Sequence, residues 1–133
     1  MQLTQFTDYS LRMLIYLAEH QGRLSTIAEV ADWYKLPKQH FVKIAHNLSV
    51  LGYIKTMRGK GGGICLNKAP EEINIGKVIR EIEPNFHIVE CFSSEHTSCR
   101  ITGNCKLKTI LHKSMSQFYD VLDKNTLSSI ISN

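Results

Sequence analysis

The sequence of 133 residues predicts a mainly α-helical fold that carries one short β-hairpin. Apolar residues recur at helical spacing in five segments, and a glycine-rich turn between two strand-like runs predicts the hairpin. The chain contains 43% hydrophobic and 21% charged residues, proportions typical of a globular protein. These observations favour one compact helical domain with a moderate hydrophobic core.

Three helices are expected in the first part of the chain. The first covers residues 6–21 and ends at Gly22, and its apolar stripe consists of Leu11, Leu14, Ile15 and Ala18. The second begins near Thr26, which forms a capping box with Glu29. After a break at residues 35–37, a third and basic helix covers residues 38–51 and buries Phe41, Ile44, Leu48 and Leu51. Two such helices are typical of a helix-turn-helix, although an ordinary helical hairpin shows the same pattern.

A basic β-hairpin is expected directly after the third helix. Its strands are residues 53–57 and 64–67, and its tight turn is the GKGGG run at residues 59–63. A hairpin in this position is the wing of a winged helix-turn-helix. Glycines such as Gly61 let the backbone approach a surface closely, and Arg58 and Lys60 flank the tip, where they could enter a minor groove or lie along phosphates. The glycine run lacks the spacing of a nucleotide-binding phosphate loop.

The C-terminal part predicts a fourth helix over residues 75–82, a cysteine-rich sensor loop and a long helix over residues 106–122. The apolar side of the long helix consists of Leu107, Ile110, Leu111, Phe118 and Leu122. We expect this side to form a dimer contact, because helix-turn-helix proteins usually read DNA in pairs; packing on its own domain is the alternative. The expected division is a DNA-binding domain (1–83), a sensor loop (84–105) and a dimerisation helix with its tail (106–133).

The positive charge is concentrated in one part of the chain. Residues 35–68 contain seven basic residues and no acid, so the rest of the chain carries −3 of the net +4. Such a distribution indicates a polyanion partner, although charge alone would also fit an ordinary solvated face. Double-stranded operator DNA is the expected partner. The residues best placed for base edges in the first turn of the third helix are Lys38, Gln39 and His40, and Lys43 could reach bases or phosphates.

Three of the four cysteines, Cys91, Cys99 and Cys105, lie in the sensor loop. The chain shows neither a secretory leader nor an apolar run long enough for a membrane span, so we expect a cytoplasmic protein without a membrane partner. Clustered thiols in the cytoplasm more often bind metal or do redox chemistry than form disulfides. Their wide spacing lacks the close pairs of structural zinc sites and suits an iron–sulfur cluster. A zinc site with one histidine is the alternative, and the nearby histidines are His87, His96 and His112.

Five stretches of the chain resemble the NsrR-like regulators, nitric-oxide-sensing members of the iron–sulfur winged-helix regulators that also include IscR and RirA. They are FTDYSLRMLIYLA, MRGKGGGICL, INIGKVIREIEP, the VECF…C…C loop and TLSSII. The resemblance covers essentially the whole chain and implies a homodimeric transcription repressor, not an enzyme. It implies one cluster per subunit on Cys91, Cys99 and Cys105, of the 4Fe–4S type in preference to 2Fe–2S. Cys65 is expected to be a buried strand residue, and the helix PKQHFVKIAHNL differs from the family, so no operator is implied.

The resemblance also implies that Asp8 of the other subunit is the fourth ligand. A carboxylate at the start of a helix is well placed to face a cation. The alternatives are that Asp8 is only a helix cap, or that His87 or His96 is the fourth ligand. Arg12 lies one turn after Asp8 and could pair with it, or reach Glu83, once the cluster is lost. Reaction with nitric oxide would then release operator DNA. A sister regulator that senses iron supply or redox state, and a zinc-stabilised regulator, are the competing hypotheses.

Overall fold

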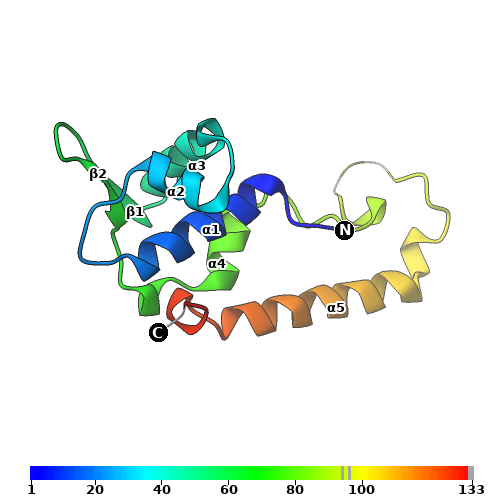
Figure 1. Cartoon of the computed structure of the whole chain (residues 1–133). Helices are drawn as coiled ribbons and strands as arrows, with labels where there is room; N and C mark the ends of the chain where they lie inside the picture. The colour runs from blue at the N-terminus through cyan, green and yellow to red at the C-terminus, as the bar shows by residue number, and fades with distance from the viewer. Residues whose placement is uncertain (94, 96, 132–133) are drawn as a thin grey trace.

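The structure, a computed structural model, describes residues 1–93, 95 and 97–131. Figure 1 shows a helical body that carries a β-hairpin at one end and a long helix along its lower side. The main elements are α1 (Gln5–Glu19), α2 (Ile27–Tyr34), α3 (Lys38–Val50), β1 (Ile54–Met57), β2 (Gly63–Leu66), α4 (Ile75–Ile82) and α5 (Lys106–Asp123). This order is that of a winged helix-turn-helix followed by one long helix, as the sequence predicted.

The hydrophobic core lies among α1, α2, α3 and α4, and the base of the hairpin closes it. Its largest fully buried side chains include Tyr53, Phe41, Met13, Leu14 and Ile44. Leu127, which follows α5 in the chain, is also fully buried in this core. The C-terminal segment therefore returns to the body after the long helix has left it.

The buried face of α1 differs from the predicted apolar stripe. Leu11 and Ile15 are only half-buried, whereas Thr7 and Ser10 are fully buried beside Met13. The two hydroxyls are satisfied inside the protein, because Ser10 Oγ donates to the Phe6 carbonyl oxygen at 2.7 Å and Thr7 Oγ1 donates to Glu83. Buried polar groups are tolerated when they are hydrogen-bonded, and a hydropathy pattern does not reveal such partners.

Local hydrogen bonds begin and end α2 where the sequence predicted, whereas α1 ends at Glu19, two residues before the predicted end. The capping box of α2 is present, with Thr26 Oγ1 accepting from the Glu29 N–H at 3.1 Å and Glu29 Oε2 accepting from the Thr26 N–H at 2.6 Å. Lys35 ends α2 in the left-handed conformation, with φ of 54°, and this turn redirects the chain into α3. The start of α2 and the turn into α3 therefore rest on short-range interactions.

The hairpin pairs its strands antiparallel, with Lys55 opposite Cys65 and Thr56 opposite Ile64. Its tight turn depends on glycine, since Gly59 and Gly61 have φ of 97° and 78°. Ser25 fastens β2 to the body through two backbone hydrogen bonds with Ile64, of 2.9 and 2.7 Å. The base of the wing is therefore held firmly, while its tip projects into solvent (Figure 1).

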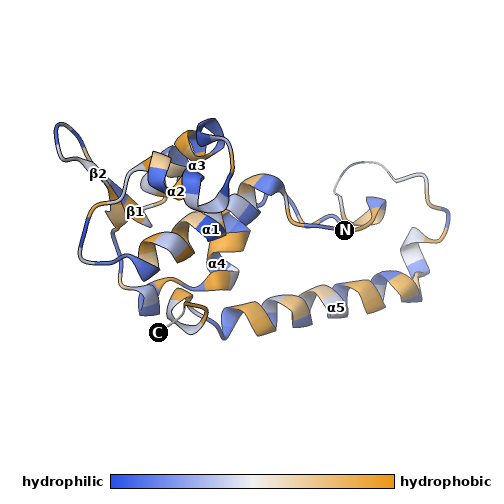
Figure 2. Ribbon diagram, in the orientation of Figure 1, coloured by the Kyte–Doolittle hydropathy of each residue, from blue (hydrophilic) through white to orange (hydrophobic). Residues whose placement is uncertain are grey.

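The long helix α5 has two different apolar sides. None of its 18 residues, all of which the structure describes, is buried. Tyr119 and Leu122 pack against the body core, whereas Leu107, Ile110, Phe118 and Val121 are exposed by 61, 59, 41 and 61%. Figure 2 shows hydrophobic positions, in orange, recurring along the ribbon of α5. The predicted single apolar side is thus divided, because Leu122 packs on its own chain.

Among the described residues, no helix combines the length and the apolar character that crossing a bilayer requires.

Candidate nucleic-acid interface and cysteine segment

The first turns of α3 present three of the predicted DNA-contacting side chains to solvent. Lys38, Gln39 and Lys43 are exposed, and within the described part of the chain none of them has a side-chain hydrogen bond or ion pair. His40 is half-buried at the edge of this surface, where its ring meets the ring of Tyr9 edge-on at 6.0 Å. Three long polar side chains are therefore available to base edges, while His40 also contributes to packing between α1 and α3.

A groove of about 630 Å³ separates the second half of α3 from the hairpin. His46 and Ser49 line it from α3, and Lys55, Thr56 and Arg58 line it from the hairpin side. The sequence predicted Arg58 as a DNA contact and included Lys55 only among the seven basic residues of residues 35–68, and it did not point to His46. The missed signal is helical spacing, because Gln39, Val42, His46 and Ser49 follow each other at intervals of three and four residues on one face of α3.

The wing tip carries Arg58, Lys60 and Gly61, all of them exposed. The arginine and lysine side chains have no ion-pair partner among the residues that the structure describes, so their charge faces solvent. The glycines leave the backbone of the tip uncovered. The hairpin thus presents Lys55 and Arg58 on one side of the groove, while Lys38 and Lys43 are exposed on the first turns of α3. Basic side chains on both elements fit the phosphate backbone of a duplex.

Free thiols of the sensor loop lie on three separate local structures. Cys91 lies in the 3-10 turn Glu90–Phe92, Cys99 is exposed in the loop, and Cys105 caps α5. Cys105 Sγ accepts a hydrogen bond from the Lys108 N–H at 3.3 Å. Within the described residues, no three potential ligands come close enough to hold a metal ion. The structure therefore places the three thiols on one segment but does not bring them together.

The chemistry of these donors nevertheless fits a cluster that binds soft ligands. All three sulfurs are free thiols on a segment outside the hydrophobic core, and thiolates are the preferred ligands of iron–sulfur clusters. The neighbouring histidines differ in their surroundings. His112 stacks on Phe92 with ring centroids 4.0 Å apart, His87 is exposed, and His96 lies outside the described residues.

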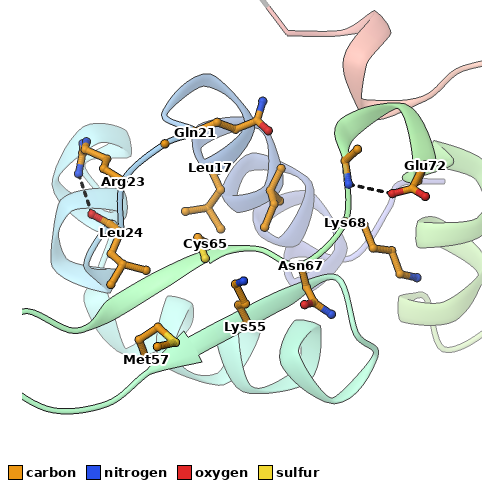
Figure 3. A pocket seen from close by; sticks show the side chains of 13 residues that line it. Leu17, Gln21, Arg23, Leu24, Lys55, Met57, Cys65, Asn67, Lys68 and Glu72 are labelled. Atoms are coloured by element: carbon orange, nitrogen blue, oxygen red, sulfur yellow. Dashed lines mark hydrogen bonds between the residues drawn. The ribbon is translucent and has the colours of Figure 1, made fainter.

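Cys65 is not the buried strand residue that the sequence predicted. Side chains alternate along a strand, and because Ile64 faces the core, Cys65 faces the opposite side of the hairpin. There it is half-buried in an open groove of about 720 Å³, beside Leu17, Met57 and Lys55 (Figure 3). The hairpin and the sensor loop lie at opposite ends of the molecule (Figure 1), so Cys65 is remote from the other three cysteines.

Asp8, Arg12 and Glu83 lie near the start of α1 in two hydrogen-bonded groups. Arg12 Nη2 contacts Asp8 Oδ2 at 2.9 Å, and the guanidinium lies over the rings of Tyr9 and Tyr34. The N-cap of α1 is Thr4, whose Oγ1 accepts from the Thr7 N–H, so the alternative that Asp8 is merely the cap is wrong.

Glu83 binds the start of α1 rather than Arg12 in this structure. Its carboxylate accepts hydrogen bonds from the Thr4 N–H at 3.1 Å, from Thr4 Oγ1 at 3.1 Å, and from Thr7 Oγ1. The residue that precedes the sensor loop is therefore connected directly to the helix that carries Asp8.

A protein-family model matches residues 3–133, and its description is "Iron-dependent Transcriptional regulator". The chain belongs to the Rrf2 family. Two relatives named HTH-type transcriptional regulator NsrR are similar over all of this chain: that of Bacillus licheniformis is 49% identical and covered over 94% of its length, and that of Bacillus subtilis is 47% identical and covered over 92%. The predicted resemblance is thereby confirmed, and the chain belongs with DNA-binding transcriptional regulators, not with enzymes.

Solved structures of Rrf2-type regulators share the fold. The oxidized form of Staphylococcus aureus CymR superimposes with a TM-score of 0.78 at 25% identity, over 100% of this chain and 98% of that one. IscR of T. potens gives a TM-score of 0.74 at 23% identity, over 96% of this chain and 84% of that one, and at this identity the likeness concerns the fold alone. The winged helix-turn-helix with a long C-terminal helix is confirmed.

Proposed function

We propose that this Rrf2 protein is a homodimeric repressor whose iron–sulfur cluster senses nitric oxide and controls its affinity for operator DNA. The observation that carries the proposal is the similarity to NsrR regulators over the whole chain, combined with three free thiols on one segment. The description of the family as iron-dependent favours iron over zinc at these thiols. The proposed place of action is the cytoplasm, without a membrane partner.

The proposed division of labour follows the three parts of the chain, residues 1–83, 84–105 and 106–133. Lys38, Gln39 and Lys43 read base edges, with His40 at the margin of the same surface. Arg58, Lys60 and the Gly61 backbone hold the wing against the duplex. The exposed residues Ile110 and Val121 on α5 support the dimer contact, because such apolar side chains gain free energy when a second copy covers them.

Cys91, Cys99 and Cys105 would hold the cluster, one per subunit and of the 4Fe–4S type, and the partner subunit's Asp8 would supply the fourth ligand. The bound cluster supplies iron, to which nitric oxide can bind. Asp8 contributes a hard carboxylate oxygen, which is a weaker partner for this iron than a thiolate. When Asp8 is not a ligand, Arg12 can pair with it, and this pair is the one that the structure contains.

Anaerobic purification tests the cofactor. The expected result is a coloured protein that contains iron and sulfide, and both should be lost after Cys91→Ser, Cys99→Ser or Cys105→Ser. Cys65→Ser is the matched control and should keep both the cluster absorbance and the response to nitric oxide, because Cys65 lies at the other end of the molecule. One zinc per chain without iron or sulfide would overturn the proposal.

Titration of the anaerobic protein identifies the signal. Nitric oxide should abolish operator binding, whereas a chelator or a mild oxidant should act more slowly. The opposite order would favour the second candidate, a regulator of iron supply, which the iron-dependent description of the family supports. Asp8→Ala should leave a more fragile cluster; if His87→Ala or His96→Ala does so instead, the assignment of the fourth ligand is wrong.

Two substitutions separate base reading from backbone contact. Gln39→Ala should relax the preference at one or two base positions, by roughly 1–3 kcal/mol each. Lys60→Ala should weaken binding to every sequence alike and lower the salt dependence by about one unit. Equal weakening of specific and random DNA by Gln39→Ala would remove Gln39 from the set of base readers.

A further inference from the structure

The long helix is joined to the winged-helix body at its C-terminal end. Beyond that end, the Ile75 N–H donates to the Asn125 carbonyl oxygen at 3.0 Å, and the Leu127 N–H donates to the Ile73 carbonyl oxygen at 2.8 Å. The N-terminal end of α5, which Cys105 caps, extends past the body (Figure 1). The helix is therefore a lever with its pivot beside the start of α4.

At this pivot, Arg80 of α4 and Asp123 of α5 form a two-pronged ion pair. Arg80 Nη1 contacts Asp123 Oδ1 at 2.6 Å, and Nη2 contacts Oδ2 at 2.8 Å. The Arg80 guanidinium also lies 4.1 Å from the centre of the Tyr119 ring, one turn earlier on α5. The planar Arg80 guanidinium contacts both a carboxylate and the face of an aromatic ring, and only a few orientations satisfy both contacts. The ion pair therefore restricts rotation of α5 against α4.

Two further groups fit around Asp123. The Asn74 side-chain amide donates to the Asp123 carbonyl oxygen at 2.7 Å. Gly76 leaves room for the carboxylate, because a Cβ at that position would collide with Asp123 Oδ1. The clamp, which we define as Arg80, Asp123 and Tyr119, therefore sits in a space shaped by its neighbours and is more than a chance surface contact.

The length of α5 makes the angle at this clamp important for DNA binding. A helix of 18 residues is about 27 Å long, so tilting it by about 10° moves its far end by about 5 Å. One base pair step is about 3.4 Å. In a dimer that is joined through α5, a small change of angle at the clamp would therefore move the two α3 helices, which are proposed to read the DNA, by more than the length of one base-pair step.

We propose that the clamp of Arg80, Asp123 and Tyr119 sets the half-site spacing, which is the distance along the DNA between the two sites that the dimer reads. The inference rests on the proposed function, since it requires a dimer that reads two half-sites. Arg80 acts through α5 and does not contact DNA, so it is a positioning residue.

Selection from a library of random DNA tests the clamp and requires no defined operator. The wild-type protein should select paired half-sites at one spacing and prefer it by about tenfold over spacings one base pair longer or shorter. Arg80→Ala should select the same half-site sequence but reduce that preference to about threefold or less. Lys77→Ala removes an exposed positive charge from the same helix without touching the clamp, and it should behave like the wild type.

A second variant protects the test against misfolding. Arg80→Lys keeps the charge but loses the fork, so it should broaden the accepted spacing in the same way. Unchanged spacing preference in both Arg80 variants would overturn the inference, and so would equal weakening on every DNA, single half-sites included. Failure of the proposed function looks different, because the wild-type protein itself would then select no paired half-sites.

Discussion

The winged-helix body and the arm that leaves it, residues 84–123, are built in opposite ways. Helices α1 to α4 each bury two or more residues, and the body encloses its own core. The arm has no buried residue in its described 3-10 turns or in α5, and it exposes Ile110 and Val121 by 59 and 61%. The body therefore encloses its own core within one chain, whereas the arm leaves apolar side chains and free thiols uncovered.

The helix starts show the same difference. Thr26 and Glu29 cap α2 with two oxygen acceptors, so the start of this helix is independent of any ligand. By contrast, the start of α5 is capped by Cys105, whose sulfur is a weak acceptor and is also a proposed cluster ligand. Local stability in the arm is thus connected to the chemistry of its cysteines.

The largest expected effect tests the self-sufficiency of the body. Phe41→Ala removes a fully buried ring between α1, α2 and α3 and should lower the free energy of unfolding by about 3–5 kcal/mol. Urea denaturation followed by circular dichroism measures this. The neighbouring Val42→Ala, at a position exposed by 47%, should change it by less than about 0.5 kcal/mol. Similar losses in both variants would contradict the described core.

An acidic residue on the exposed side of α5 tests the dependence of the arm on a second copy. Ile110→Glu should raise the dimer dissociation constant at least about tenfold while leaving unfolding of the body nearly unchanged. Ser116→Glu adds the same charge on the other side of α5 and should leave the dimer intact. Analytical ultracentrifugation over a concentration series distinguishes the two. A dimer that survives Ile110→Glu would place the interface elsewhere.

Removing the N-cap side chains of α2 and α5 compares how much each cap contributes to the stability of the body and of the arm. Thr26→Ala should lower the free energy of unfolding by about 1 kcal/mol, because the Glu29 N–H loses its acceptor. Cys105→Ala in cluster-free protein should have a smaller effect, since a thiol accepts hydrogen bonds weakly. Urea denaturation of both variants gives the comparison, and a larger loss at Cys105 would show that the arm contributes more to stability than its exposure suggests.

The smallest effect is a pH dependence at the joint between body and arm. Burial raises the pKa of Tyr119 to about 12 from an ordinary value of 10.0. A raised folded-state pKa stabilises the protein below the unfolded pKa, so this contribution is present below pH 10.0 and disappears as the pH rises toward about 12. Tyr119→Phe should remove that part of the alkaline loss, as urea midpoints between these pH values would reveal; identical profiles would contradict it.

Short-range features of this protein were predictable from its sequence. The capping box of Thr26, the break at residues 35–37, the glycine turn of the wing and the extent of α5 all depend on residues within about four positions of one another. The same holds for exposed Lys38, Gln39 and Lys60, because first-turn and hairpin-tip positions are visible in the chain itself. The Asp8–Arg12 pair, at a separation of four residues, belongs with them.

Only the tertiary structure decided which residues far apart in the sequence contact each other. Glu83 reaches Thr4 over 79 residues, Arg80 meets Asp123 over 43, and Cys65 faces away from the core because Ile64 is fastened to Ser25. Such contacts arise when several elements pack together, and packing depends on the shape and hydrogen-bonding of all of them at once. The sequence by itself therefore determined the helices, the wing and the kind of chemistry that its cysteines can do. The packing of the body determined the buried face of α1 and the angle at which α5 leaves it.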